Sequence, residues 1–222
     1  MRDNEHKILA TSRIAVQSSR QREVETMAES GVATALVVDN KDDSGTGRVR
    51  IRYPWHEQPL ETYWARVATP MTGSKRGFYF IPEEGDEVLV AFERGDFRVP
   101  YVIGALWNTS TRPPVAIADG TNDVRLIRTR KGHTLTFDDG AKGRVQLELN
   151  SGKRLSMDDE TIALQDERGN ALTIQSASGT LTIRATGRVR LQAPQISLES
   201  SGTIDIKAGA TLTLQGALVN IN

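Results

Sequence analysis

The residues best suited to general acid and base chemistry are two pairs of neighbouring carboxylates, Asp138-Asp139 and Asp158-Asp159. Enzymes that hydrolyse polysaccharides need two carboxyl groups at a defined separation, flanking the bond that breaks. Adjacent residues in a turn point in different directions, and no aromatic residue that could stack on a sugar ring follows Phe137. The two pairs therefore predict solvated turns rather than the active site of a polysaccharide depolymerase.

Other groups that catalyse reactions or bind metals are scarce. The chain has 222 residues, no Cys and three His, which excludes disulfide frameworks, thiolate zinc sites and thiol nucleophiles. His56 and His133 are isolated, and Thr109 and Ser110 lack the His and Asp that would activate a hydroxyl. The Gly-Gly-x-Gly-x-Asp repeats of calcium-binding β-rolls are also absent. We therefore expect a protein that is not an enzyme and holds no metal or cofactor.

Three arginines form the remaining candidate site. Arg48, Arg50 and Arg52 alternate with apolar residues, which predicts a strand with the arginines on one face. With Trp55 nearby, this face is similar to a basic and aromatic surface for nucleic acid. The whole chain, however, balances 28 basic against 28 acidic residues, whereas a protein that holds phosphate backbones needs a basic excess. We assign the arginines to an inter-subunit contact and expect no nucleic acid partner.

The distribution of aromatic residues divides the chain into two parts with different kinds of core. Eleven of the twelve aromatic residues lie between Tyr53 and Trp107, the twelfth is Phe137, and the last 85 residues contain none. Aromatic side chains fill compact cores because each buries a large area. The chain therefore predicts a compact domain followed by a thin structure whose centre has no room for rings.

Residues 31–108 are typical of short strands separated by turns, without a convincing helix. The predicted strands are Ala33–Asp39, Arg48–Tyr53, Thr62–Thr69, Phe78–Ile81, Glu87–Glu93 and Pro100–Trp107. This spacing fits a small β-barrel. Residues 109–123 contain two prolines and a glycine, which predicts a linker, and residues 1–30 predict an arm that is either disordered or docked on a neighbouring chain. The mixed charge of this arm predicts neither a signal peptide nor a membrane span.

From Val124 onward the sequence repeats, most clearly in units such as SGTLTIRA, TGRVRLQA and SGTIDIKA. Each unit carries two apolar residues with one residue between them, which is a short strand with one buried face. We expect ten of these residues to lie on a central axis: Leu181, Ile183, Val189, Leu191, Ile196, Leu198, Ile204, Ile206, Leu212 and Leu214.

These units are too short to close around a core of their own, so their apolar faces must meet other chains. Three chains around one axis would bury a column of Leu, Ile and Val and give each strand edge a partner. The absence of aromatic residues agrees with so narrow an axis. The sequence thus predicts an all-β chain, with a barrel followed by a trimeric β-helix or β-prism over residues 124–222. A single-chain β-solenoid of an adhesin or fibre is the alternative.

The run WARVATPMTGSKRGFYFIPEEGDEVLVAFERGDFRVPYVIGALWN resembles the oligosaccharide/oligonucleotide-binding (OB) barrel of contractile-tail spike proteins. That family includes VgrG of type VI secretion, the baseplate assembly protein V of contractile phages, and the spikes of extracellular injection systems. The segments GRVRIRYPW, NDVRLIRTRKGHTLTFDD and LTLQGALVNIN are similar to it as well, so the resemblance covers roughly residues 31–222.

The resemblance implies a homotrimeric, non-enzymatic spike at the baseplate tip, which joins a hub to a PAAR-repeat tip protein and pierces the target envelope when the sheath contracts. It implies a separate hub protein, since about 30 residues precede the barrel, and contact with the target membrane only during puncture. It also implies that neither a lysozyme domain nor an apical iron site is present, because residues 109–123 are short and no His follows His133.

For the apex, the resemblance implies that the last residues dock the tip protein. We assign this role to Gly216, Ala217, Leu218, Val219, Asn220, Ile221 and Asn222. Arg48, Arg50 and Arg52 would then contact the hub or a neighbouring subunit. The chain would be made in the cytoplasm without a signal peptide and incorporated into a virion or an extracellular particle. The alternative is an OB-type module on a fibre stalk that binds glycan or nucleic acid.

Overall fold

The computed structural model describes residues 31–55, 62–117 and 120–221, and throughout these ranges the chain forms strands and turns but no helix. The described residues divide into two compact units, one that ends at Ala116 and one that begins at Ile117. Their secondary structure offers no helix that is long and apolar enough to cross a membrane. The expected N-terminal arm (1–30), His56 and Asn222 lie outside the described residues. The predicted all-β class is confirmed.

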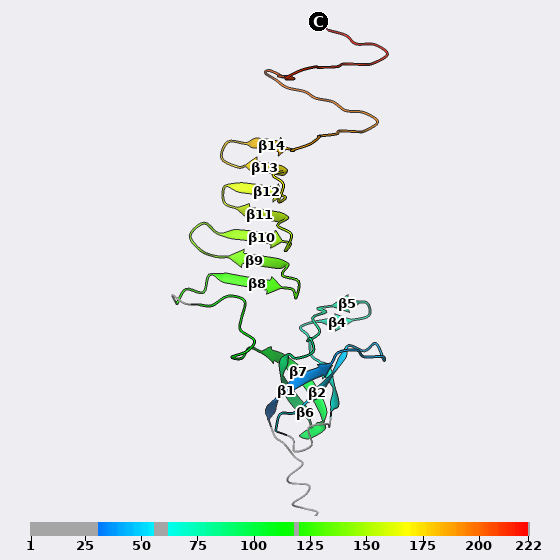
Figure 1. The fold of residues 1–222 in the computed structure, drawn as a ribbon, viewed down its shortest axis with the longest axis vertical. Helices are drawn as coiled ribbons and strands as arrows, with labels where there is room; N and C mark the ends of the chain where they lie inside the picture. Colours follow the sequence, from blue (N-terminus) through cyan, green and yellow to red (C-terminus); the bar gives the residue numbers. More distant parts are fainter. Residues whose placement is uncertain (1–30, 56–61, 118–119, 222) are drawn as a thin grey trace, which may run out of the picture. The chain divides into compact units, whose positions relative to one another are not determined.

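The first unit contains a closed barrel of five strands (Figure 1). Around the barrel the order is β1, β2, β3, β7, β6, and all neighbours are antiparallel except β3 and β7, which are parallel. The strands are β1 (Val32–Asp39), β2 (Arg48–Arg52), β3 (Tyr63–Val67), β6 (Glu87–Glu93) and β7 (Asp96–Leu106). A small closed barrel of five strands is the architecture of OB domains, so the predicted barrel is confirmed.

The barrel core is built from alternate residues of each strand, as the sequence of β2 illustrates. Val49 and Ile51 are fully buried, and Tyr53 follows them into the core. Arg48 and Arg50 lie between them on the outer face, since successive side chains of a strand point to opposite sides. Each buried aliphatic side chain stabilises the fold by about 1.5–3 kcal/mol, and the core draws such residues from all five strands.

A small hairpin, β4 (Thr72–Gly73) with β5 (Arg76–Gly77), lies between β3 and β6 in the chain. The residues after it, Phe78–Ile81, do not form the strand that we predicted. Phe78, Tyr79 and Phe80 are 52%, 83% and 60% exposed. A barrel strand sends alternate residues to the core, and three aromatic residues in succession do not fit that alternation. Their β propensity alone was therefore misleading.

The second unit contains a seven-stranded antiparallel sheet in which every strand pairs with its neighbours in sequence (Figure 1). Its strands are β8 (Val124–Arg128), β9 (Thr134–Asp138), β10 (Arg144–Glu148), β11 (Arg154–Asp158), β12 (Thr161–Gln165), β13 (Ala171–Gln175) and β14 (Thr180–Arg184). On one side of the sheet the turn repeats: the amides of Thr129, Leu149 and Asp166 each donate to the carbonyl four residues later. Over this range, strand pairing is thus supplied by the chain itself.

The regular strand pairing of the sheet ends at β14. The described residues 185–221 contain no strand, and they make no backbone-to-backbone hydrogen bond with one another or with the sheet. Figure 1 shows them as a winding trace that continues from β14 without a strand beside it. Here the short repeat units are present in the sequence, but the described part of the single chain offers no neighbouring strand with which their backbone could pair.

Candidate functional site

One face of the β8–β14 sheet is apolar along its whole length. The strand registers align two rows of side chains across it. The first row is Ile127, Leu135, Leu147, Leu155, Leu164, Leu172 and Ile183, and the second is Phe137, Val145, Met157, Ile162, Ile174 and Leu181. All except Leu135 and Val145 are 37–60% exposed in the single chain.

The opposite face of the same sheet is polar. Thr136, Gln146, Ser156, Thr173 and Thr182 follow one another across the strands, and the apolar members of this row are Leu126 in β8 and the small residue Ala163 in β12. Monomeric proteins rarely expose an apolar surface that extends over so many strands, and such a surface marks a contact with another molecule. The apolar face is therefore a candidate interface, and the polar face is suited to water.

The ten residues expected on the trimer axis are all exposed in the single chain. Leu181 and Ile183 belong to β14, and the other eight lie beyond it, with exposed fractions of 52–68% for the whole set. The described residues 185–221 make no backbone-to-backbone hydrogen bonds within the chain, and extended backbone that is removed from water needs hydrogen-bond partners. Both the side chains and the backbone of residues 185–221 thus require other chains to become buried.

The candidate tip-docking residues are also exposed. Leu218 and Ile221 are 78% and 85% exposed, and Val219 is half exposed. Gly216, Ala217 and Asn220 are likewise exposed, whereas Asn222 lies outside the described residues. The structure therefore leaves the described residues of this set exposed in the single chain.

Arg48 and Arg50 share one aromatic partner on the outside of the barrel. Their guanidinium carbons lie 5.1 and 4.7 Å from the centre of the Trp64 ring on the adjacent strand β3. Next along β3, Arg66 lies 5.6 Å from the Tyr101 ring of β7. Arg52 is the third half-buried arginine of β2. Because Trp64 already contacts two guanidinium groups of its own chain, less of its surface is left to stack on a base.

Asp42, in the loop before β2, fixes the position of Arg48. Its carboxylate accepts hydrogen bonds from Arg48 Nη2 at 3.0 Å, Ser44 Oγ at 2.6 Å and Thr46 Oγ1 at 2.9 Å. The Arg48 guanidinium, followed by the Ser44 hydroxyl, holds the pKa of Asp42 well below its usual range. Asp42 is therefore charged at neutral pH, and Arg48 contributes a balanced ion pair rather than a free cation.

The carboxylate pairs Asp138-Asp139 and Asp158-Asp159 lie at turns of the sheet, where they form local contacts. Asp139 forms an ion pair with Arg125 at 2.8 Å, and Asp138 accepts a hydrogen bond from the amide of Gly140. Asp158 accepts from the amides of Glu160, in the turn after β11, and of Thr161, the first residue of β12. No group of three or more potential metal ligands occurs among the residues that the structure describes. These contacts are typical of structural turn residues.

His133 also makes a contact between turns of the sheet. Its Nδ1 accepts a hydrogen bond from the backbone amide of Asn150, 3.2 Å away in the next turn on the same side of the sheet. This contact ties the β8–β9 turn to the β10–β11 turn. It gives His133 a structural role at the start of the sheet.

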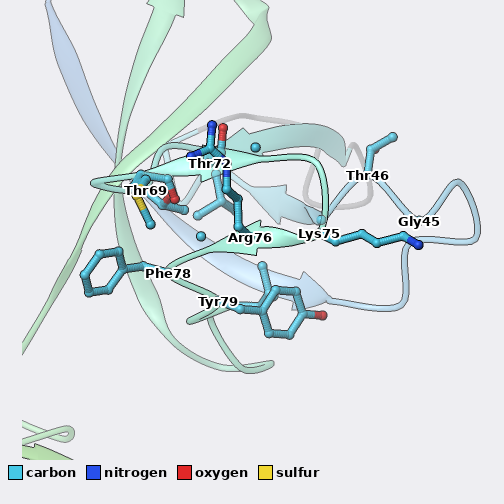
Figure 2. Close-up of a pocket in the computed structure, with 14 residues that line it drawn as sticks. Gly45, Thr46, Thr69, Thr72, Lys75, Arg76, Phe78 and Tyr79 are labelled. Atoms are coloured by element: carbon cyan, nitrogen blue, oxygen red, sulfur yellow. The ribbon is translucent and has the colours of Figure 1, made fainter.

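A pocket of about 540 Å³ lies beside the β4–β5 hairpin (Figure 2). Lys75 and Arg76 are the charged residues of its lining, which also includes Phe78 and Tyr79 and contains no carboxylate or histidine. Figure 2 shows Lys75 extending from the hairpin. With cations and exposed aromatic rings but no acid or base, this pocket is suited to a protein contact rather than to hydrolysis.

Two features of these surfaces were absent from the sequence predictions. One is the exposed aromatic segment Phe78–Phe80, which a strand had been expected to bury. The other is the contribution of β8 and β10 to the apolar face, through Ile127, Val145 and Leu147. The segment Arg144–Glu148 has the same pattern of two apolar residues around a polar one as the repeats that were recognised, so its signal was present in the sequence.

Comparison with known proteins identifies the barrel. The "Type VI secretion system/phage-baseplate injector OB domain" matches residues 33–107, which run from β1 to the end of β7. The chain is similar to the actin cross-linking toxin VgrG1 of Vibrio cholerae, with 28% identity over 171 residues, or 71% of this chain.

Two further relatives are named as type VI secretion system spike proteins. VgrG3 of Vibrio cholerae is 33% identical over 48% of this chain, and VgrG2a of Pseudomonas aeruginosa is 36% identical over 42% of it. The chain spans 16%, 11% and 12% of the lengths of these three relatives, in the order given. Residues 33–107 thus form an injector OB domain of type VI secretion systems and phage baseplates, and the chain that carries this domain is similar to VgrG spike proteins.

Proposed function

We propose that three copies of this chain form the central spike of a contractile tail or injection machine, without enzymatic activity of their own. The spike would join a separate hub protein to a PAAR-repeat tip protein and pierce the target envelope when the sheath contracts. One observation carries this proposal: an apolar sheet face, open along seven strands, is followed by a repeat whose described residues make no backbone-to-backbone hydrogen bond within their own chain.

The two parts of the second unit would assemble in different ways. Three β8–β14 sheets would pack their apolar faces around one axis, as the sides of a prism. Residues 185–221 would add one extended segment per chain to each layer, with backbone hydrogen bonds between chains, and so form an intertwined β-helix. The proposed boundaries are an arm at 1–30, the barrel at 31–108, a linker at 109–123 and the spike at 124–222.

The barrel would serve as the platform for the hub. Arg48, Arg50 and Arg52 on the outer face of β2 and the exposed aromatic segment Phe78–Phe80 are the two surfaces that suit contacts with the hub or a neighbouring subunit. Arginine and aromatic side chains are enriched in such contacts. As part of an assembled virion or secreted particle, the chain would meet a target membrane only during puncture.

The stoichiometry of the purified full chain tests this proposal. Light scattering should give a mass three times the 24.4 kDa of the chain, because the apolar face is covered only when three chains associate. A stable monomer would overturn the spike assignment. A salt-dependent binding assay with single-stranded nucleic acid or glycan should show no binding, and measurable binding would favour the OB-module alternative instead.

The proposed apex gives a second test, with the PAAR-repeat tip protein as the partner. Deletion of residues 217–222 should abolish co-purification with the tip protein while the trimer remains, because the deletion removes the exposed apolar end and leaves the sheet intact. The variant Thr213→Ala, on an exposed polar residue between Leu212 and Leu214, serves as the control and should retain the tip. Tip binding by the truncated chain would refute the docking assignment.

A further inference from the structure

The two edges of the β8–β14 sheet carry opposite charge. Successive antiparallel strands place their connecting turns on alternate sides, so the turns at 129–133, 149–153 and 166–170 share one edge. The turns at 139–143, 159–160 and 176–179 share the other edge, together with Asp123, the residue before β8.

The first edge, with the strand ends that adjoin its turns, is called the basic edge. It carries seven cationic and three acidic residues: Arg128, Arg130, Lys131, Lys153, Arg154, Arg168 and Arg184, with Glu148, Asp166 and Glu167. The opposite, acidic edge carries six acidic and two cationic residues: Asp123, Asp138, Asp139, Asp158, Asp159 and Glu160, with Lys142 and Arg144.

Ion pairs within the chain leave this asymmetry in place. On the basic edge, Lys153 contacts Glu167 at 3.2 Å, and the carboxylate of Asp166 accepts hydrogen bonds from its own turn. Arg128, Lys131 and Arg168 have no ion-pair partner among the described residues.

On the acidic edge, too, ion pairs neutralise only some of the charged residues. Arg144 contacts Asp138 at 3.4 Å, and Arg125, the second residue of β8, contacts Asp139. Within the described part of the chain, Asp159 and Glu160 are exposed and have no ion-pair partner. Each edge thus keeps an excess of one sign among its described residues.

We infer that the basic edge of each sheet docks against the acidic edge of a second copy of this chain, and that this contact makes all three chains run in the same direction. The inference rests on the proposed trimer. In a three-fold ring of sheets with their apolar faces inward, each corner joins one edge of a chain to the opposite edge of the next. A chain inserted upside down would bring like edges together, and such juxtaposition is disfavoured.

The order of the strands also matches the heights of the charges. Three-fold symmetry shifts no chain along the axis. The β8–β9 turn of one chain, with Arg128 and Lys131, therefore faces the start of β8 in the neighbouring chain, where Asp123 lies. In the same way, the β12–β13 turn with Arg168 lies one strand above the β11–β12 turn with Asp159 and Glu160. Single exposed pairs contribute little, about 0.2–1 kcal/mol, but six sets of such groups meet at three corners.

Charge reversal of the full chain tests the inference. One variant reverses the basic edge (Arg128→Glu, Lys131→Glu, Arg168→Glu), a second reverses the acidic edge (Asp123→Lys, Asp159→Lys, Glu160→Lys), and a third combines all six substitutions. Each edge variant should raise the concentration at which the trimer dissociates by about tenfold or more at low salt. The combined variant should restore assembly, because its edges are again opposite in sign.

Salt and the wild-type control separate the outcomes. At 1 M NaCl the Debye length falls to about 3 Å, so the difference between the edge variants and the wild type should shrink. Trimers of both edge variants as stable as the wild type at low salt, or a combined variant no better than they are, would overturn the docking of opposite edges while the trimer stands. A monomeric wild-type chain would instead overturn the trimer itself.

Discussion

Replacement of Ile183 by Asp should convert the proposed trimer into monomers. Ile183 ends the first apolar row of the sheet, in register with Leu172, and it is 58% exposed in the single chain. In the trimer three copies would meet near the axis, where each isoleucine gains about 1.5–3 kcal/mol from burial. Three carboxylates there would each cost several kcal/mol in lost hydration and would repel one another. Light scattering at micromolar concentration should therefore give the monomer mass.

The neighbouring residue provides a matched control. Thr182 precedes Ile183 in β14, pairs with Thr173 and points to the polar face. Thr182→Asp introduces the same charge one residue away, on a surface that stays in water, and should leave the trimer intact. Equal loss of the trimer in both variants would mean that general damage to β14 is responsible. A persistent Ile183→Asp trimer would contradict the apolar axis.

The sequence predicted those parts of the fold in which alternation has one solution. Arg48–Tyr53 alternates strictly, and a shift of one residue would bury three arginines, so its register was readable. The apolar pairs of β9 and of β11–β14 likewise identified side chains that share a face. In Phe78–Phe80 three aromatic residues stand in succession, and no periodicity indicated that the chain would leave them exposed.

Which strands of the repeat pair with each other was harder to predict from the sequence than which side chains share a face. Between β8 and β11 strands begin every ten residues, which leaves five residues for each reversal of the chain. Later apolar pairs recur every seven or eight residues, with less room for a hairpin after a strand of the same length. Spacing alone does not separate the two parts, however, because β11 and β12 begin seven residues apart and still pair within the sheet. The charge asymmetry of the edges was likewise invisible until the meander placed alternate turns on opposite sides.

Replacement of Tyr53 by Ala should strongly destabilise the barrel. Tyr53 is 1% exposed, and its ring lies 4.9 Å from that of Trp55 and 5.4 Å from that of Tyr63, measured between ring centres. Its hydroxyl donates to the carbonyl of Phe97 at 2.6 Å. Truncation of a large buried aromatic side chain typically costs about 3–5 kcal/mol, a large part of the 5–15 kcal/mol that stabilises a domain. We expect a marked fall in the urea concentration at which the barrel unfolds.

Tryptophan fluorescence can report this change selectively, because the three tryptophans, Trp55, Trp64 and Trp107, all precede the β8–β14 sheet in the chain. Tyr53→Phe is the matched control. It keeps the ring contacts and loses only the hydroxyl, which should cost about 1 kcal/mol for the hydrogen bond to Phe97. The expected order of unfolding midpoints is therefore wild type, Tyr53→Phe and, far below, Tyr53→Ala. If the alanine variant unfolded at the wild-type midpoint, Tyr53 would not be the centre of the aromatic core, and barrel stability would have to come from the aliphatic residues alone.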